Sequence, residues 1–319
     1  MRRMLLIFSV LMLLLSLLFT FIPSQAQEAT PTPVIAPTTV STPIPRPSPV
    51  NTVTQDGVTL ELLFTSIAQG QVGIVRLSGA GIVGGRANFI DKLTEFFQME
   101  GDGFYGLLSV NMDQTPGVYP LEVYADYDAQ TRITLTAEVE VVQGAFIRQD
   151  VTIVDDRAYL IDPQIERNEF ARLESLYNNF TLTRYWQGGA FQLPVPSVMT
   201  SPFGVFRVLN NTVTTRHTGW DLRAAFGTPV MSMASGVVVF AGLMDIRGNY
   251  VFIDHGYGVF SGYAHLSQIH VTRGQEVVEG QIIGVVGDTG RSNGAHFHWE
   301  MTVNGEWVDT AQFLQTWLP

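Results

Sequence analysis

Hydrophobic and polar residues alternate along several short segments in the first half of the chain. The alternation is clearest in residues 133–141, and it also occurs in residues 60–64 and 121–125. Because successive side chains of a β-strand point to opposite faces of a sheet, a period of two residues indicates half-buried strands. Turns that contain glycine or proline separate these segments. We therefore predict a small antiparallel β-sandwich over residues 53–144.

The pattern becomes helical for a short distance within residues 145–193. Asp162 can cap a helix whose first residue is a proline, because its side chain can accept a hydrogen bond from a backbone N–H group of the first turn. Phe170, Leu173 and Tyr177 then fall on one face of this helix. We predict a connector with one helix, which packs against one of the β-domains.

From residue 194 to the C-terminus, short hydrophobic runs are separated by glycine and show almost no helical period. These runs predict strands at residues 236–241, 250–254, 258–265, 281–286 and 296–302. The predicted fold class is therefore all-β. It consists of an N-terminal sandwich, a short helical connector and a second β-domain over residues 194–319.

The N-terminus has the features of an export signal. Two arginines precede an apolar run over residues 4–22, and small residues occupy the positions that determine cleavage. We predict a signal peptide over residues 1–26; because the apolar run is long, an uncleaved membrane anchor is the alternative. Residues 27–52 are rich in proline and threonine and predict an extended linker. The remainder is then extracytoplasmic: secreted, in the cell envelope, or anchored and facing outward.

Composition excludes several classes of function. The chain has 319 residues, a formal net charge of −11 and a pI of about 4.9, whereas nucleic-acid binding needs clustered positive charge. It has no cysteine, which excludes a thiol hydrolase and a lipoprotein. Lys92 is the only lysine and Phe89 lies three residues before it, so the serine–lysine peptidase motif is absent. A metal ion is the natural remaining means of activating a nucleophile. We expect a monomer.

The histidines are concentrated in one region. All six lie between His217 and His298. His296 and His298 are two residues apart in a predicted strand, so both point to the same face as a chelating pair. His217 and Asp221 are four residues apart, and Gly219 between them argues against a helix, so a loop or extended segment would present them together. Two imidazoles, one carboxylate and an open fourth position are typical of a catalytic zinc ion.

Three other polar residues in this region have weaker patterns. His255 and His270 lack a partner at ligand spacing, so we predict a hydrogen-bonded or surface role for each. His255 follows Asp254 near the predicted site, and contact with a metal ligand is the alternative for it. Glu300 shares the face of the histidine pair by alternation. It could orient a ligand, and an ordinary solvated carboxylate is an equally good interpretation.

Short motifs occur in a characteristic order over the last two-fifths of the chain. They read SPFG (Ser201–Gly204), HTGWD (His217–Asp221), GTPV (Gly227–Val230), GNYVFIDHG (Gly248–Gly256), YAHLS (Tyr263–Ser267), GQEVVEGQIIGVVGDTG (Gly274–Gly290) and HFHWE (His296–Glu300). In residue type and spacing they resemble the M23 family of zinc metallopeptidases, the lysostaphin- and LytM-like enzymes that cut peptidoglycan peptides. The resemblance implies an M23-type β-sheet or barrel-like domain.

The resemblance also assigns roles to five residues. It implies that His217, Asp221 and His298 bind one Zn²⁺, and that His265 and His296 form an unliganded catalytic pair. One histidine of the pair would act as general base, and the other would stabilise the tetrahedral intermediate or protonate the leaving amine. Which histidine has which role is left open.

The implied function is that of an exported zinc metalloendopeptidase, which hydrolyses peptide bonds in peptidoglycan stem or cross-bridge peptides. One alternative is a non-catalytic LytM-like factor that binds the cell wall or activates an amidase, and another is a structural surface protein. Residues 103–125 resemble bacterial Ig-like modules, so the predicted sandwich is Ig-like, with spacing, wall binding and partner contact as open roles. The connector could also shield the zinc cleft in a resting form.

Overall fold

The structure is a computed structural model that describes residues 44–128, 130–187 and 191–319. The predicted signal peptide and residues 27–43 of the predicted linker lie outside the described residues. Among the residues described, no helix is both long and apolar enough to span a membrane. All described residues belong to one compact unit.

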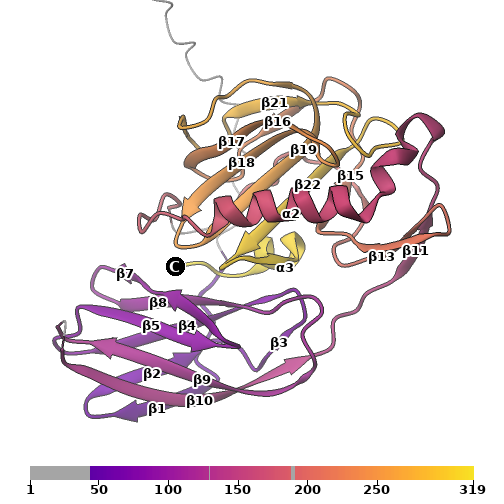
Figure 1. The fold of residues 1–319 in the computed structure, drawn as a ribbon. Helices are drawn as coiled ribbons and strands as arrows, with labels where there is room; N and C mark the ends of the chain where they lie inside the picture. Colours follow the sequence, from indigo (N-terminus) through magenta and orange to yellow (C-terminus); the bar gives the residue numbers. More distant parts are fainter. Residues whose placement is uncertain (1–43, 129, 188–190) are drawn as a thin grey trace, which may run out of the picture. The chain divides into compact units, whose positions relative to one another are not determined.

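The first part of the chain forms two β-sheets (Figure 1). Buried side chains from both sheets belong to one hydrophobic core. Within the described residues each sheet has five strands, in the orders β1(Asn51–Gln55)-β2(Val58–Leu62)-β4(Val72–Gly79)-β8(Gly103–Ser109)-β7(Phe97–Met99) and β3(Ser66–Ala68)-β10(Arg132–Val142)-β9(Gly117–Asp126)-β5(Gly84–Phe89)-β6(Lys92–Glu95). In β9, Leu121, Val123 and Ala125 are fully buried in this core, as the two-residue period predicts. The two sheets form the predicted sandwich, and its likeness to Ig-like modules stays a prediction.

A large antiparallel sheet carries the C-terminal part of the chain. Over the described residues it has ten strands, and seven of them follow the order β12(Met199–Ser201)-β15(Gly219–Leu222)-β22(Phe297–Val303)-β19(Val259–Ile269)-β18(Gly248–Gly256)-β17(Gly236–Met244)-β20(Glu276–Val277). The other three pair beside this path: β16(Pro229–Met231) with β21(Ile282–Val286), β21 with β19, and β23(Glu306–Val308) with β22. Each strand predicted in this region is found, and the all-β fold class is confirmed.

The connector adds one strand to a smaller sheet. Strand β11 (Arg148–Val151) runs parallel to β13 (Phe206–Leu209), which pairs with β14 (Val213–Arg216). After β11 the chain forms a 3-10 helix, η1 (Asp155–Ile161). The connector strand is therefore bonded to the segment that leads into His217.

The predicted connector helix is present as α2 (Pro163–Tyr177) (Figure 1). Asp162 accepts a hydrogen bond from the backbone N–H of Gln164 at 2.8 Å, which is the predicted cap. Leu173 packs in a cluster with aromatic residues of β17, β18 and β19, and Phe170 and Tyr177 pack against the same cluster. Helix α2 thus covers one face of the large sheet. A second helix, α3 (Thr310–Gln315), follows β23 and was not predicted.

Candidate metal centre

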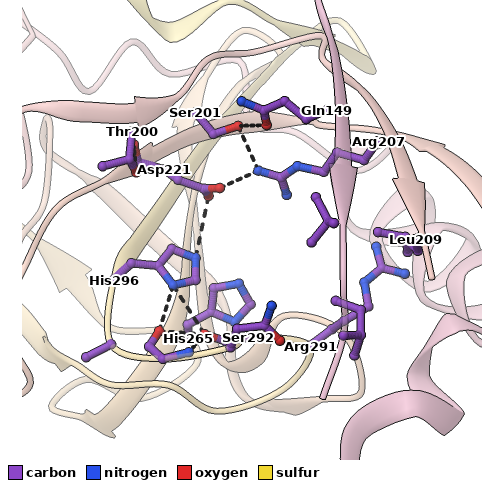
Figure 2. A pocket seen from close by; sticks show the side chains of 15 residues that line it. Gln149, Thr200, Ser201, Arg207, Leu209, Asp221, His265, Arg291, Ser292 and His296 are labelled. Carbon is purple, nitrogen blue, oxygen red and sulfur yellow. Dashed lines mark hydrogen bonds and ion pairs between the residues drawn. The ribbon is translucent and has the colours of Figure 1, made fainter. Parts of the chain in front are cut away.

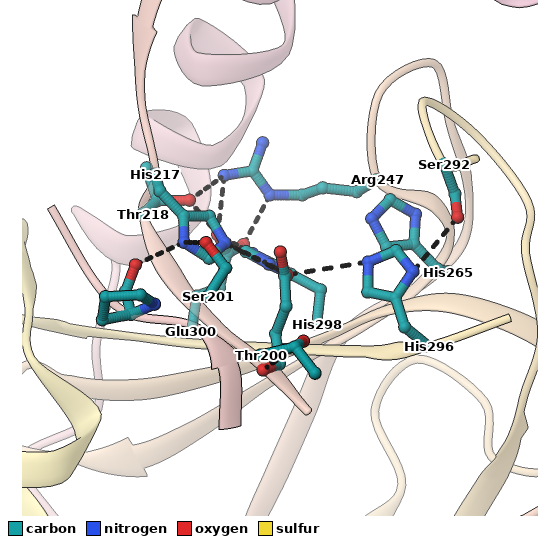
Figure 3. Close-up of polar contacts among 12 residues, drawn as sticks. Thr200, Ser201, His217, Thr218, Arg247, His265, Ser292, His296, His298 and Glu300 are labelled. Atoms are coloured by element: carbon teal, nitrogen blue, oxygen red, sulfur yellow. Dashed lines mark hydrogen bonds and ion pairs between the residues drawn. The ribbon is translucent and has the colours of Figure 1, made fainter. Parts of the chain in front are cut away.

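Strand pairing brings the predicted ligands together. In the antiparallel pair of β15 and β22, Asp221 lies directly opposite His298. Opposed residues of such a pair hold their side chains close together on one face. His217 lies just before β15, and its ring turns toward His298 (Figure 3). Gly219 permits this approach, because a Cβ atom there would overlap the backbone oxygen of Trp299 on β22.

His217, Asp221 and His298 each present one donor atom to a common point. His217 Nε2 lies 3.1 Å from Asp221 Oδ1 and 3.1 Å from His298 Nδ1, and the last two atoms are 2.9 Å apart. Atoms bound tetrahedrally to zinc at about 2 Å lie about 3 to 3.5 Å from one another. All three residues are buried, and together they form a group that could hold a metal ion.

Each donor atom is oriented by a hydrogen bond on the other side of its side chain. His217 Nδ1 lies 2.6 Å from the backbone oxygen of Pro202, which fixes a proton on Nδ1 and leaves the lone pair on Nε2. His298 Nε2 lies 3.2 Å from Glu300 Oε2, which leaves the lone pair on Nδ1. Arg207 donates to Asp221 Oδ2, so Oδ1 faces the two histidines. Three electron-pair donors that face one another in a buried space fit a cation such as Zn²⁺.

Burial and neighbouring charges act in opposite directions on these groups. Burial raises the pKa of Asp221, but His217 and Arg207 outweigh it and hold this pKa well below its ordinary value. Burial lowers the pKa of His217 to about 4. Burial also lowers the pKa of His298, but hydrogen bonds to Asp221 and Glu300 raise it above its ordinary value. At neutral pH, Asp221 is therefore ionised and His217 is neutral, which are the forms that bind metal.

His265 and His296 lie beside this group (Figures 2 and 3). The centroids of their rings are 4.8 Å apart. His265 has a φ angle of 58°, which is rare for a residue other than glycine, and its Nδ1 lies 2.7 Å from Thr289 O. His296 Nδ1 lies 2.9 Å from Gly294 O, and its Nε2 lies 3.6 Å from Asp221 Oδ1. Both rings engage a backbone carbonyl through Nδ1, so Nε2 is available for proton transfer.

A cavity of about 430 Å³ adjoins these side chains (Figure 2). Asp221, His265 and His296 line it on one side. The connector also lines it, through the alternate residues Gln149, Val151 and Ile153. Because alternate residues of a strand share a face, one face of β11 forms part of the cavity wall. The space beside the donor atoms is therefore shaped partly by the connector.

The predictions for the remaining polar residues are resolved by their contacts. Glu300 is fully buried and lies against His298, so the solvated interpretation is wrong and the orienting one fits. The His255 ring contacts Ser235 O at 2.8 Å and Ser261 Oγ at 2.7 Å, and these contacts include no residue of the metal group. His270 is exposed. The suggested contact between His255 and a metal ligand is therefore not supported.

Sequence reasoning missed three residues behind the metal group: Glu169, Arg207 and Arg247. Glu169 offered one signal, because it lies four residues before Leu173 and so places a carboxylate on the buried face of α2. Arg247 and Arg207 offered no such signal. Arg247 pairs with Glu300, which is distant in the chain, and Arg207 pairs with Asp221 at a separation that is not a ligand spacing.

Comparisons with known proteins concern mainly the C-terminal part. The model of peptidase family M23 matches residues 215–310. The DD-carboxypeptidase/endopeptidase Mpg of Neisseria meningitidis is 46% identical over 112 residues, which are 35% of this chain and 26% of that protein. The peptidoglycan DD-endopeptidase ShyA of Vibrio cholerae is 45% identical over 93 residues, which are 29% of this chain and 22% of that protein. The chain thus spans about a quarter of the length of these relatives.

A solved structure extends the likeness beyond the matched domain. The crystal structure of a peptidase M23 from Pseudomonas aeruginosa superposes with a TM-score of 0.60 and 27% sequence identity. The superposition covers 79% of this chain and 96% of that chain. The shared fold therefore includes residues that precede the segment matched by the family model.

Proposed function

We propose that this protein is a zinc metalloendopeptidase that hydrolyses peptide bonds of peptidoglycan, because residues 215–310 match the model of peptidase family M23 and resemble peptidoglycan endopeptidases. The observation that carries the proposal is the convergence of His217 Nε2, Asp221 Oδ1 and His298 Nδ1 within 3.1 Å of one another. Zn²⁺ bound by these atoms would supply the Lewis acid that polarises a scissile carbonyl and activates a water molecule.

The chain's own residues supply the proton transfers in this proposal. Burial and the neighbouring histidines hold the pKa of His265 well below its ordinary value, so its imidazole is neutral at neutral pH and can accept a proton at Nε2. His296 lies on the cavity wall, with Nδ1 bonded to Gly294 O. Nε2 of His296 is therefore the second atom able to move a proton or to stabilise charge on the substrate.

The proposed substrate is a peptide of peptidoglycan, in the stem or in the cross-bridge. The names of the two relatives make D,D-peptide bonds the first bonds to test. A peptidoglycan substrate requires that the enzyme act outside the cytoplasm, which agrees with the predicted signal peptide. We propose that the enzyme acts as a monomer, with residues 53–144 as a sandwich domain that precedes the connector.

The test is a digestion of purified peptidoglycan by residues 27–319, with mass spectrometry of the released fragments. We expect new peptide termini that name the bond, no release after chelation of the metal, and release at least about 100-fold slower in His296→Ala. His270→Ala is the matched control, because it removes an exposed histidine outside the metal group. Digestion that persists equally in His296→Ala and in chelator would overturn the proposal. So would zinc binding without any cleavage by the wild-type protein, which is the behaviour expected of a non-catalytic factor.

A further inference from the structure

A carboxylate of the connector lies buried inside the C-terminal β-domain. Glu169 of α2 is 5% exposed, although it is a charged residue in the middle of a helix. Its two oxygens accept hydrogen bonds from the backbone N–H groups of Ile246 at 2.7 Å and Arg247 at 3.2 Å. Arg247 Nη1 also donates to Glu169 Oε1 at 2.7 Å. Glu169 therefore holds both the backbone and the side chain of Arg247.

Arg247 joins this carboxylate to a second one. Its Nε and Nη2 donate to the two oxygens of Glu300 at 2.5 and 2.9 Å, while Nη1 remains on Glu169. Arg247 is 4% exposed and Glu300 is fully buried, so water does not screen these contacts. Figure 3 shows Arg247 and Glu300 together with His298. A planar guanidinium can make two such contacts at once, whereas the single ammonium of a lysine cannot reproduce this fork.

The second carboxylate touches the metal group. Glu300 Oε2 lies 3.2 Å from His298 Nε2, on the side of the ring opposite the donor atom Nδ1. A contiguous series of buried contacts thus runs from Glu169 through Arg247 and Glu300 to His298. The backbone of Arg247 has a second effect, because its oxygen accepts a hydrogen bond from the N–H of His265 at 2.8 Å.

Two carboxylates share one guanidinium here, and this arrangement ties the orientation of Glu300 to Glu169. Without Glu169, the Arg247 fork loses one of its two anchors and the backbone N–H groups of residues 246 and 247 lose their acceptor. Glu300 would keep its hydrogen bonds from Thr218 at 2.5 Å and from Tyr250 at 2.7 Å, but it would lose the fixed position of the guanidinium fork. The contact between Glu300 and His298 Nε2 would then be held by fewer fixed groups. Partners of this kind commonly set metal affinity, and their loss weakens it by about 10- to 100-fold.

We propose that Glu169 of helix α2 is a positioning residue of the metal centre, which acts through Arg247 and Glu300 to orient His298. This inference rests on the proposed zinc site. It makes the connector helix part of the metal centre, although the helix contributes no ligand.

The first experiment measures zinc affinity of full-length Glu169→Gln by competition with a chromophoric chelator. We expect zinc to bind about tenfold more weakly than in the wild-type protein, because the isosteric amide loses the charge that holds Arg247. We also expect a changed visible absorption spectrum when Co²⁺ replaces zinc. Arg247→Lys, which keeps the charge but loses the fork, should weaken zinc binding by a similar factor. It replaces Glu169→Gln as the test variant if Glu169→Gln does not fold.

Two variants of the same helix separate positioning from simple anchoring. Glu174→Gln makes the same chemical change at an exposed position of the same helix. Leu173→Ala removes a fully buried side chain that holds the helix on the sheet. We expect both to bind zinc within about twofold of wild type, because neither changes the contacts of Glu300.

The proposal is overturned if Glu169→Gln and Arg247→Lys bind zinc with wild-type affinity and spectrum. It is also overturned if Leu173→Ala weakens zinc binding as much as Glu169→Gln, since helix docking alone would then explain the effect. Peptidoglycan cleavage is measured separately. If the wild-type protein binds zinc but does not cleave peptidoglycan, the proposed function is wrong. The zinc measurements still test this inference in that case.

Discussion

At the scale of single residues, the two histidines of the metal group and the proposed catalytic pair differ in where the second nitrogen of each ring lies. His217 Nδ1 contacts Pro202 O, and His298 Nε2 contacts Glu300. The donor atoms His217 Nε2 and His298 Nδ1 lie 3.1 Å apart. His265 and His296 use backbone carbonyls in the same way, but their Nε2 atoms lie outside the triangle of donor atoms. The two pairs should therefore respond differently to substitution.

The first prediction concerns that difference. His217→Ala should lose most of its zinc and all cleavage, because one of three donor atoms is removed. His296→Ala should keep zinc within about threefold of wild type and lose about 10²- to 10⁴-fold in cleavage rate, the range typical of a lost acid–base group. Elemental analysis and a peptide-release assay check both. If His296→Ala loses zinc as completely as His217→Ala, His296 is a ligand.

At the scale of elements, the connector strand β11 forms a wall of the cavity rather than a separate spacer. Gln149, Val151 and Ile153 face the cavity, while Arg148 and Asp150 are exposed on the other face. The connector was also predicted to be able to shield the metal site. If β11 helps to place the substrate, a disruptive substitution in β11 should lower the cleavage rate. If β11 instead excludes the substrate, such a substitution should raise the rate.

The second prediction uses the two faces of this strand. Val151→Trp should fill part of the cavity and lower kcat/KM for peptidoglycan peptides at least about tenfold, without a change in zinc content, because the substrate is displaced. Asp150→Trp places the same side chain on the opposite face and should have little effect. Cleavage kinetics with a soluble peptide fragment check both. An increase in rate for Val151→Trp would favour a shield.

At the scale of the whole molecule, buried histidines link folding to pH. His255 is completely buried, and burial lowers its pKa to about 4. In the unfolded chain its pKa returns to about 6.5. Between these values the unfolded state binds a proton that the folded state does not, so stability falls as the pH falls from about 6.5 to about 4. The difference of the two pKa values corresponds to roughly 3 kcal/mol for this one group.

The third prediction is that the free energy of unfolding of the metal-free protein decreases between pH 7 and pH 4.5. His255→Gln should show a smaller decrease, because the amide can contact Ser235 O and Ser261 Oγ but does not titrate. Urea denaturation at the two pH values measures the difference. Equal decreases in the two proteins would mean that protonation of His255 does not contribute.

The sequence alone determined the features that depend on near neighbours. The two-residue period along β9 and β10, the Asp162 cap and the buried face of α2 follow from rules that act over a few residues. The spacings within His217–Asp221 and His296–His298 and the order of the motifs were enough to propose a zinc site. The resemblance to peptidase family M23 and the all-β fold class could be predicted for the same reason.

The tertiary structure alone decided the contacts behind these residues. The pairing of β15 with β22 sets Asp221 opposite His298, and the positive φ of His265 places its ring beside them. Arg247 meets Glu169 and Glu300 across 78 and 53 residues of chain. A local sequence pattern does not predict such pairs, because these charges come together only through burial and the docking of α2 on the sheet. The proposed role of the connector in the metal centre therefore depends on packing rather than on any motif.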